Sequence, residues 1–342
     1  MGSHMGLRIA TYNVAWFNAL FDDDGGLLAD NEPSSRHGIT RAAQIAALGL
    51  VFRAMDADGV MVIEAPDTGS RRSTVTALER FAAQFGLRAR RAVMGFASET
   101  EQEIAFLYDP DRLTPHHDPQ ASEATPRFDA SYTYDRDTAP QIIRFSKPPL
   151  ELTVAGSGKT LRLIGVHAKS KAPHGARNKA AAARISTENR RKQLAQCLWL
   201  RARVDAHLAA GNSLIVLGDF NDGPGIDDFE ALFGRSGVEI VLGTDLPAPQ
   251  RLYDPHATMA LASRVGLTPT TARFWIDPQK RYFEALLDFV MVSPDLAALG
   301  PIWRIWHPFN DPACHGDRGL SDALLQASDH FPVSLDFGDP PA

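Results

Sequence analysis

The sequence predicts an α/β protein of the α+β kind, in which two facing sheets are covered on their outer sides by helices. Three observations lead to this prediction. Helical segments occur in both halves of the 342 residues, runs of short strands lie between them, and no long linker rich in proline, glycine and serine divides the chain. We expect one domain over residues 6–338, with MGSHM at 1–5 resembling an expression tag and a short tail at 339–342.

The first quarter of the chain alternates between strands and helices. Residues 7–14 alternate between apolar and polar side chains, which predicts a strand. Apolar residues recur at helical spacing over 38–55 and again over 74–85, which indicates two amphipathic helices. Between these helices, the apolar run at 59–66 predicts a buried strand.

The middle of the chain changes to short strands joined by loops rich in proline, aspartate, glycine and serine, which favours antiparallel pairing. These strands are expected at 88–94, 103–108, 141–145, 150–154 and 161–167. A long helix follows over 180–210, beginning in a run of alanines and ending at Gly211.

The last third combines strands with long connections. Three strands are expected there, at 214–219, 283–292 and 331–337. A short helix is expected at 227–233. The segments 224–282 and 294–328 are long for connections, and we expect them to be largely irregular and to shape a substrate groove.

Composition sets limits on the class of protein. With 44% hydrophobic and 22% charged residues the chain is typical of a soluble globular protein. No apolar run approaches the roughly 18 residues that a membrane span requires. Cys197 and Cys314 are too few for a disulfide scaffold and suit a reducing cytoplasm, so we expect a cytoplasmic protein, with removal of a secretion signal as the alternative. We also expect a monomer.

Charge is unevenly distributed along the chain. The net charge of −6 argues against a protein whose main task is to coat nucleic acid. Between residues 155 and 204, however, Glu188 is the only acid among many bases. The bases are Lys159, Arg162, Lys169, Lys171, Arg177, Lys179, Arg184, Arg190, Arg191, Lys192, Arg201 and Arg203. Two interpretations explain this stretch equally well. It forms either a surface that recruits a phosphate-bearing partner or a solvated helix face.

Polar residues follow or interrupt apolar strands at several places along the chain. They are Asn13, Glu64, His167, Asp219, Asn221, Asp288, Asp329 and His330. Carboxylate and amide oxygens at the rim of a sheet are suited to a hard divalent cation or a water nucleophile. Asp288 has apolar residues on both sides and needs a partner if it is buried, and His330 is the candidate.

Taken singly, most of these residues also have structural interpretations. Asn13 and Asn221 are good turn formers, because their side chains bond to nearby backbone. Glu64 precedes Ala65-Pro66 and ends a strand, and His167 is explained as a hydrogen-bonded histidine at a sheet rim. The whole series, rather than any one member, favours a functional site.

The series resembles the endonuclease/exonuclease/phosphatase superfamily, the group of pancreatic deoxyribonuclease. The matching blocks are Thr11-Tyr12-Asn13-Val14, Ile63-Glu64, Gly165-Val166-His167, Leu217-Gly218-Asp219-Phe220-Asn221, Leu287-Asp288-Phe289-Val290 and Ser328-Asp329-His330-Phe331-Pro332-Val333. The fourth and sixth are the most specific. The resemblance implies a four-layer αββα sandwich of mixed, mostly antiparallel sheets, and hydrolysis of a phosphate ester with one or two Mg²⁺ or Mn²⁺ ions.

The resemblance also implies a role for each polar residue. Glu64 is the main metal ligand, Asp329 is a second acid beside it, and Asn13 holds the metal water or the phosphate. The others are expected to perform the chemistry. Asp219 and Asn221 act on the attacking water. His330 contacts a phosphate oxygen, and Asp288 fixes its tautomer. His167 contacts the phosphate or the leaving oxygen.

The chain departs from the family pattern at three places. Ile63 stands where the family often has glutamine before the metal-binding glutamate. Both Gln102 and Glu103 fall near the place of a glutamate that orients the first histidine in the deoxyribonuclease branch, and the choice stays open. Lys147 stands where that branch places a phosphate-binding arginine, and supplies a point charge instead of a bidentate fork.

The expected substrate is a phosphodiester, first of all nucleic acid. His167-Ala168-Lys169-Ser170-Lys171 resembles a stretch of bacterial nuclease-like members, so Lys147, Lys169 and Lys171 are expected to bind substrate. The first hypothesis is therefore a metal-dependent endonuclease or exonuclease for DNA or RNA. The alternatives are a phosphatase or phosphodiesterase for a small or lipid-linked phosphate, and a binding module that has lost activity.

Overall fold

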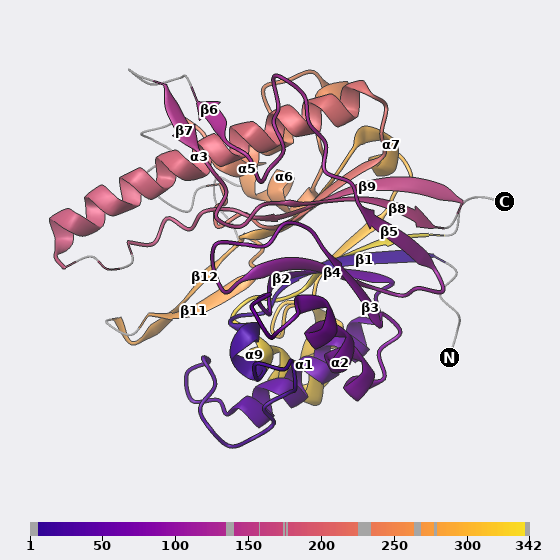
Figure 1. Cartoon of the computed structure of the whole chain (residues 1–342), viewed down its shortest axis with the longest axis vertical. Coiled ribbons are helices and arrows are strands. Elements are labelled where there is room, and N and C mark those ends of the chain that lie inside the picture. Colours follow the sequence, from indigo (N-terminus) through magenta and orange to yellow (C-terminus); the bar gives the residue numbers. More distant parts are fainter. Residues whose placement is uncertain are drawn as a thin grey trace.

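The structure, a computed structural model, describes residues 6–134, 140–156, 158–173, 175, 177–224, 234–262, 268–276 and 279–338. Two sheets lie face to face, and helices cover the outer face of each (Figure 1). The predicted arrangement of two mixed sheets with helices outside is therefore confirmed. The helix expected at 227–233 lies outside the described residues.

The first sheet has six strands, of which only β1 and β2 are parallel neighbours. Their spatial order is β14 (Ile302–Ile305), β15 (Val333–Phe337), β1 (Leu7–Asn13), β2 (Gly59–Ala65), β4 (Glu103–Tyr108) and β3 (Arg91–Met94). Its outer face is covered by α1 (Arg41–Met55), α2 (Thr74–Phe85) and α9 (Arg318–Ala327) (Figure 1).

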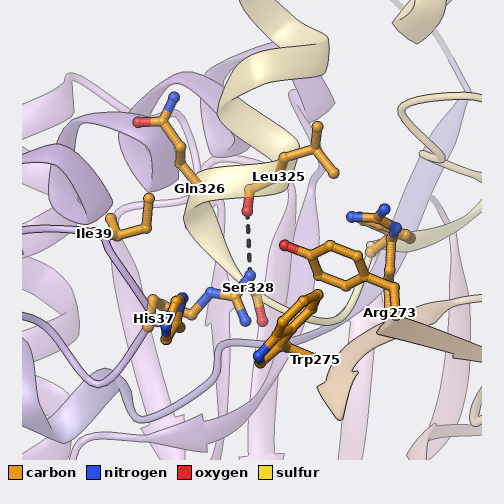
Figure 2. A pocket seen from close by; sticks show the side chains of 10 residues that line it. His37, Ile39, Arg273, Trp275, Leu325, Gln326 and Ser328 are labelled. Carbon is orange, nitrogen blue, oxygen red and sulfur yellow. Dashed lines mark hydrogen bonds between the residues drawn. The ribbon is translucent and has the colours of Figure 1, made fainter. Parts of the chain in front are cut away.

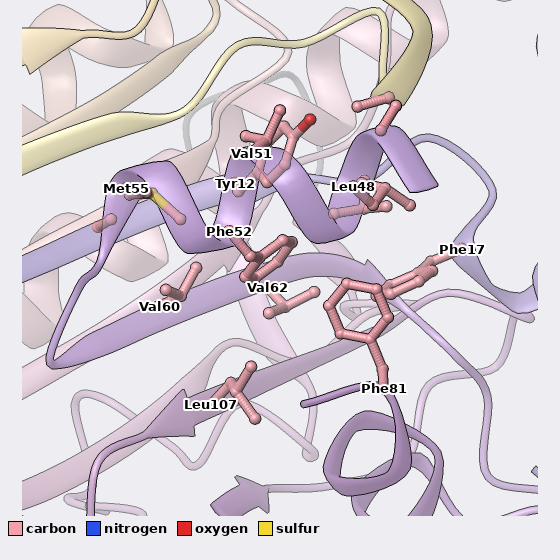
Figure 3. Packing of buried hydrophobic residues seen from close by; sticks show 14 of the residues in the cluster. Tyr12, Phe17, Leu48, Val51, Phe52, Met55, Val60, Val62, Phe81 and Leu107 are labelled. Atoms are coloured by element: carbon pink, nitrogen blue, oxygen red, sulfur yellow. The ribbon is translucent and has the colours of Figure 1, made fainter. Parts of the chain in front are cut away.

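Aromatic and aliphatic side chains form the core between this sheet and its covering helices (Figure 3). Phe52 from α1 and Phe81 from α2 meet with ring centroids 5.2 Å apart, and Phe52 also contacts Tyr12 of β1. Thr40 accepts a hydrogen bond from the Ala43 amide, so it caps α1, and the predicted helix begins after it. Burial of this apolar surface holds the helices against the sheet.

The second sheet has five strands, and again one parallel pair, β9 with β10. Their order is β13 (Asp288–Val292), β10 (Leu214–Asp219), β9 (Lys159–His167), β8 (Leu150–Gly156) and β5 (Leu113–His117). Its outer face is covered by the long α3 (Lys179–Ala209) and by α5 (Gly237–Leu242) and α6 (Pro255–Ala262) (Figure 1).

Between the two sheets lies a layer of buried apolar side chains, including Ile9, Met61, Phe106, Leu163 and Leu217. Strands β1, β2 and β10 are buried almost throughout, as expected for strands with apolar side chains on both faces.

Smaller elements complete the structure. Two hairpins project from the sheets, β6 (Tyr132–Tyr134) with β7 (Gln141–Ile143), and β11 (Ala272–Ile276) with β12 (Arg281–Ala285). Short helices are η1 (Phe17–Leu20), η2 (Ala248–Gln250), α7 (Pro294–Ala297) and α8 (Pro312–Gly316). None of the helices described is both long and apolar enough to cross a bilayer.

Two expectations about the last third were wrong. The single strand over 283–292 is two strands, because β12 pairs with β11 whereas β13 pairs with β10, and the chain changes sheet at Leu286-Leu287. These two leucines are buried and continue the apolar pattern, which hides the break. The segments 224–282 and 294–328 carry helices and strands instead of mainly irregular chain.

The two parallel pairs determine where functional side chains meet. Strands β1 and β2 run in the same direction, as do β9 and β10, so their carboxyl ends lie at common edges. In the second sheet, Asp219 at the end of β10 is paired with His167 at the end of β9 and with Asp288 at the start of β13.

Candidate active site

The strand ends of both sheets border one cavity with a volume of about 410 Å³. Eight of the residues predicted for the site line it, namely Glu64, Lys147, His167, Lys169, Asp219, Asn221, Asp329 and His330. Asn13 and Asp288 lie directly behind this lining, bonded to Asp219 and His330 respectively. Side chains that are far apart in the sequence are thus brought into one site.

Asp219 is held by amide groups on three sides. Its Oδ1 accepts a hydrogen bond from the Asn221 backbone N–H at 2.7 Å, and its Oδ2 accepts from the side-chain amides of Asn13 at 2.9 Å and Asn221 at 3.2 Å. Burial raises the pKa of Asp219 to about 7. A carboxylate in this state is suited to accept a proton from water near neutral pH.

The backbone around Asp219 explains why Gly218 precedes it. Gly218 has a φ of +140°, and a Cβ there would lie 2.0 Å from the carbonyl oxygen of Val166 on β9. Only glycine therefore lets β10 approach β9 this closely. Asn221 has a φ of 48°, the left-handed region that asparagine tolerates, and this turn directs its N–H at Asp219.

Glu64 occupies an irregular position in β2. The register between β2 and β4 shifts between Ile63 and Ala65, and Glu64 has a φ of 62°. Its Oε2 accepts a hydrogen bond from the backbone N–H of Trp16 at 3.0 Å, while burial raises the pKa of its carboxyl group. A left-handed glutamate costs about 1–3 kcal/mol, so the surrounding structure holds it there at an expense in stability.

His167 and Lys147 form the basic side of the cavity. The Lys147 Nζ lies 3.2 Å from His167 Nε2, which is also 4.0 Å from Glu64 Oε1 and 3.8 Å from Asp219 Oδ2. Burial, followed by the positive charges of Lys147 and His330, holds the pKa of His167 well below its usual value. His167 is therefore neutral, and Lys147 is half-buried, with its pKa lowered by burial.

His330 is paired with a carboxylate. Its Nδ1 lies 2.7 Å from Asp288 Oδ2, which also accepts a hydrogen bond from the Thr271 hydroxyl at 2.8 Å. Burial alone would lower the pKa of His330, but the Asp288 carboxylate outweighs this effect and raises it to about 10. His330 is thus an imidazolium at neutral pH, and it faces the cavity.

Asp329 borders the same cavity as Glu64. Its Oδ2 lies 3.4 Å from Arg36 Nη1, and its negative charge is one of the causes that raise the pKa of Glu64. The two carboxylates that the resemblance assigns to a metal therefore lie on one side of the molecule, next to His330.

Two groups of residues could hold a divalent cation. Ligand atoms of Asp219, Asp288 and His330 lie within 4.8 Å of one another. However, a protonated imidazole has no lone pair for a metal, and Asp288 Oδ2 already accepts from Thr271 and pairs with His330.

The second group consists of oxygen atoms. It combines the carboxylates of Glu64 and Asp329 with the Asn13 side-chain oxygen, which is buried and has no hydrogen-bond partner in the part of the chain described. Oxygen donors with two negative charges fit a hard cation such as Mg²⁺ or Mn²⁺ better than the first group does.

The remaining predicted residues are placed differently. Lys169 lines the cavity, but Lys171 turns away to Asp222, with its Nζ 2.6 Å from Oδ1 of that fully buried carboxylate. Of the two residues left open as the partner of His167, Gln102 lines the cavity. Glu103 is buried elsewhere and accepts a hydrogen bond from Ser98 N at 2.8 Å.

Three residues of the site were not predicted from the sequence. Arg36 holds Asp329, Thr271 holds Asp288, and Phe274 packs its ring edge-on to His330 with centroids 5.4 Å apart. Arg36 lies in a polar loop, and no pattern in the sequence points to it. Phe274 and Thr271 belong to the β11 region, for which no definite strand was predicted.

Comparison with known families and structures agrees with the geometry. Residues 10–330 match the Endonuclease/Exonuclease/phosphatase family. No curated protein matches the sequence.

Solved structures share the fold at low sequence identity. A truncated TDP2 from Caenorhabditis elegans has 12% identity and a TM-score of 0.53, covering 98% of this chain and 98% of that chain. TDP2 from D. rerio complexed with single strand DNA product has 14% identity and a TM-score of 0.51, covering 97% of this chain and 98% of that chain. The 3'-5' exonuclease NExo from Neisseria meningitidis has 16% identity and a TM-score of 0.50, covering 97% of this chain and 100% of that chain.

Proposed function

The chain belongs to the endonuclease/exonuclease/phosphatase family, whose members hydrolyse phosphate esters, and we propose that it is a divalent-metal-dependent phosphodiesterase that cleaves DNA or RNA. One observation carries the proposal. A single cavity presents a carboxylate pair for a cation, a carboxyl group with a pKa near neutrality, and an imidazolium. These are the groups that cleavage of a phosphodiester requires.

On the attacking side, we assign the alignment of water to Asp219. Its carboxylate accepts the proton, and the amides of Asn13 and Asn221 keep it oriented. Above a pH of about 7 the group is ionised and available as a base.

On the phosphate, His330 donates a hydrogen bond to a non-bridging oxygen from its Nε2–H. Asp288 holds the ring by Nδ1 and keeps it charged. Glu64, Asp329 and Asn13 would hold the cation, which would neutralise charge on the phosphoryl group and on the leaving oxygen.

On the opposite side of the cavity, Lys147 supplies a second positive charge for the phosphate. The neutral His167 beside it is available to accept a hydrogen bond or to bind the leaving group through Nε2.

Nucleic acid is proposed as the substrate on three grounds. Lys147 and Lys169 line the cavity. Helix α3, which contributes Gln196 to the lining, exposes Arg184 and Arg191, so a chain of phosphates meets positive charge in both places. The D. rerio TDP2 complexed with single strand DNA product shares the fold. The C. elegans and Neisseria structures share it as well, and the second of these is described as a 3'-5' exonuclease.

One observation favours the alternative, a phosphatase or phosphodiesterase for a small or lipid-linked phosphate. The cavity of about 410 Å³ has the size of a small-molecule site. A small ester therefore fits it without reaching the exposed basic residues of α3.

A substrate panel tests the proposal. With Mg²⁺ or Mn²⁺ we expect fragments from supercoiled plasmid, single-stranded DNA or RNA on gels, and no fragments with EDTA. The control variant is His315→Gln, which changes an exposed histidine of α8 and is expected to cleave like the wild type. Release of phosphate from small monoesters with intact polymers would support the alternative instead. No cleavage of any ester, together with no metal binding by calorimetry, would favour the inactive binding module.

A further inference from the structure

A second pocket lies beside the candidate active site (Figure 2). It has a volume of about 240 Å³ and lies between the loop that precedes α1 and the hairpin β11–β12. Four aromatic residues contribute to its lining, His37, Trp275, Tyr282 and Phe331, together with Arg36 and Arg273. We call it the aromatic pocket.

The aromatic pocket and the catalytic cavity share a wall. On β11, Arg273 and Trp275 face the aromatic pocket, whereas Phe274 between them lines the cavity. This is the alternation of a strand, in which every second side chain points the same way, with about 3.3 Å per residue.

The segment before β15 divides in a similar way. Ser328 and Phe331 line the aromatic pocket, and Asp329 and His330 between them line the cavity. The two spaces are therefore separated by one layer of side chains. A bound polymer whose phosphate lies at His330 can therefore place a group of its next unit in the aromatic pocket.

The rings form a slot that is suited to a flat group once His37 moves aside. The His37 and Trp275 rings are stacked, with centroids 6.3 Å apart and planes that differ by 24°. A ring between two others needs about 7 Å, twice the contact distance of carbon atoms, so a flat group would stack on Trp275 in the place of the exposed His37. Trp275 and Tyr282 also meet edge to face, with centroids 5.0 Å apart.

Polar groups border the slot. Arg273 lies 3.5 Å from the Tyr282 ring centroid and its Nε lies 3.1 Å from Glu284 Oε1, so the guanidinium presents a flat, charged surface. Arg36 donates to the Leu325 carbonyl at 3.1 Å (Figure 2) and also contacts Asp329. Gln326 and Ser328 add hydrogen-bonding groups to the lining.

We propose that the aromatic pocket binds the base of a nucleotide that flanks the scissile phosphate. A nucleobase combines a flat face for stacking with polar edges that can bond to the surrounding donors and acceptors, whereas a hydrocarbon ring offers them no hydrogen bond. The volume is below the roughly 300–1,000 Å³ of sites for drug-sized ligands, so it fits one base. The inference rests on the proposed function, because it needs a nucleic acid substrate.

The test compares two substrates with the same phosphate backbone. One is a dodecamer of thymidine, and the other is a dodecamer of abasic tetrahydrofuran residues. Stacking of one base on aromatic side chains changes affinity by about 5- to 150-fold, so the wild type is expected to have a KM for the thymidine oligomer lower by a factor in this range.

Substitution of Trp275 then locates the effect. With Trp275→Ala the ratio of the two KM values is expected to fall toward one, and with Trp275→Phe, which keeps a stacking ring, to remain largely intact. The matched control is Tyr253→Ala, which removes an aromatic ring of similar exposure outside this pocket and is expected to keep the wild-type ratio.

The outcomes separate the two proposals. If the wild type cleaves both oligomers with nearly equal KM values, the inference is wrong and the proposed function stands. The same holds if Trp275→Ala raises both KM values equally. Cleavage of neither oligomer, with hydrolysis of bis(p-nitrophenyl) phosphate, would overturn both the choice of nucleic acid and the base pocket. The inference is supported if the difference between the two KM values is lost in Trp275→Ala and is kept in Trp275→Phe and Tyr253→Ala.

Discussion

The two histidines of the cavity, His167 and His330, are opposites in charge although both are buried. Each is about 5% exposed and each borders the same space. His167 lies beside the ammonium group of Lys147, and its pKa is held well below the usual value. His330 lies beside the carboxylate of Asp288, and its pKa is raised to about 10.

The difference shows that the partner, and not the depth of burial, decides the protonation state. Desolvation lowers the pKa of both rings, and only the carboxylate at His330 reverses the effect. One fold therefore presents a neutral imidazole and an imidazolium to the same cavity.

Removal of the charged ring should have the largest effect. The variant His330→Gln keeps a hydrogen-bond donor but loses the positive charge, and we expect kcat/KM to fall by about 10³-fold, within the range typical of a positioned acid or base. Single-turnover cleavage with saturating Mg²⁺ measures it. If kcat/KM falls less than about tenfold while thermal unfolding is unchanged, His330 does not act on the phosphate.

The next variant keeps the ring and removes its partner. In the wild type, kcat/KM should rise with pH as Asp219 ionises near pH 7 and fall as His330 loses its proton near pH 10. In Asp288→Asn the largest opposition to desolvation is removed. Only Asp219 and Asp329 still raise the pKa of His330, so this pKa should fall from about 10 toward its ordinary value of about 6.5. The alkaline limb then moves toward the acid limb.

Because few molecules then carry both an ionised Asp219 and a charged His330, we expect kcat/KM at neutral pH to fall by about 10²-fold. The pH profile of kcat/KM distinguishes this cause from misfolding, because a merely structural loss would lower the curve without moving its limbs. An alkaline limb that stays near pH 10 in Asp288→Asn would contradict the assignment.

The same pair contributes to stability. The pKa of His330 is higher in the folded than in the unfolded protein, so the pair stabilises the fold fully below about pH 6.5 and progressively less as pH rises through about 10. Asp288→Asn should therefore lose stability relative to the wild type at pH 6 and differ less above pH 10, which denaturant unfolding at the two pH values measures.

Strand-end placement was enough to predict most of the cavity, because a residue that ends a buried strand must lie at the edge of its sheet. Glu64, His167 and Asp219 follow this rule, and the need of Asp288 for a partner pointed to His330. The same reasoning predicted the two helix-covered sheets, since helical and strand periodicities are properties of neighbouring residues.

Contacts that depend on tertiary arrangement could not be predicted. Lys169 and Lys171 look alike in the sequence, but only the structure shows that Lys171 pairs with Asp222, which is itself buried with Arg190. The break between β12 and β13 was missed because Leu286-Leu287 is as apolar as the strands that it joins. In contrast, α9 was missed although Leu320, Ala323, Leu324 and Ala327 form an apolar stripe at helical spacing.

The smallest effect is expected at the neutral histidine. Lys147→Met removes the ammonium group 3.2 Å from His167 Nε2, and since that charge lowers the pKa of His167, the pKa should rise. Cleavage should weaken by about tenfold, mainly through KM, because a charge-assisted hydrogen bond to phosphate contributes about 1.5 kcal/mol. The His167 ring resonance, followed by NMR across pH, measures the first effect, and steady-state kinetics the second.

The control for this variant is Lys169→Met, which takes one positive charge from the same cavity while leaving the Lys147 ammonium at His167. It should weaken substrate binding without moving the His167 titration. If both variants raise the pKa of His167 equally, the total positive charge of the cavity, and not the adjacent lysine in particular, keeps the ring neutral. If neither does, burial and the positive charge of His330 account for the neutral state of His167 without any contribution from the lysines.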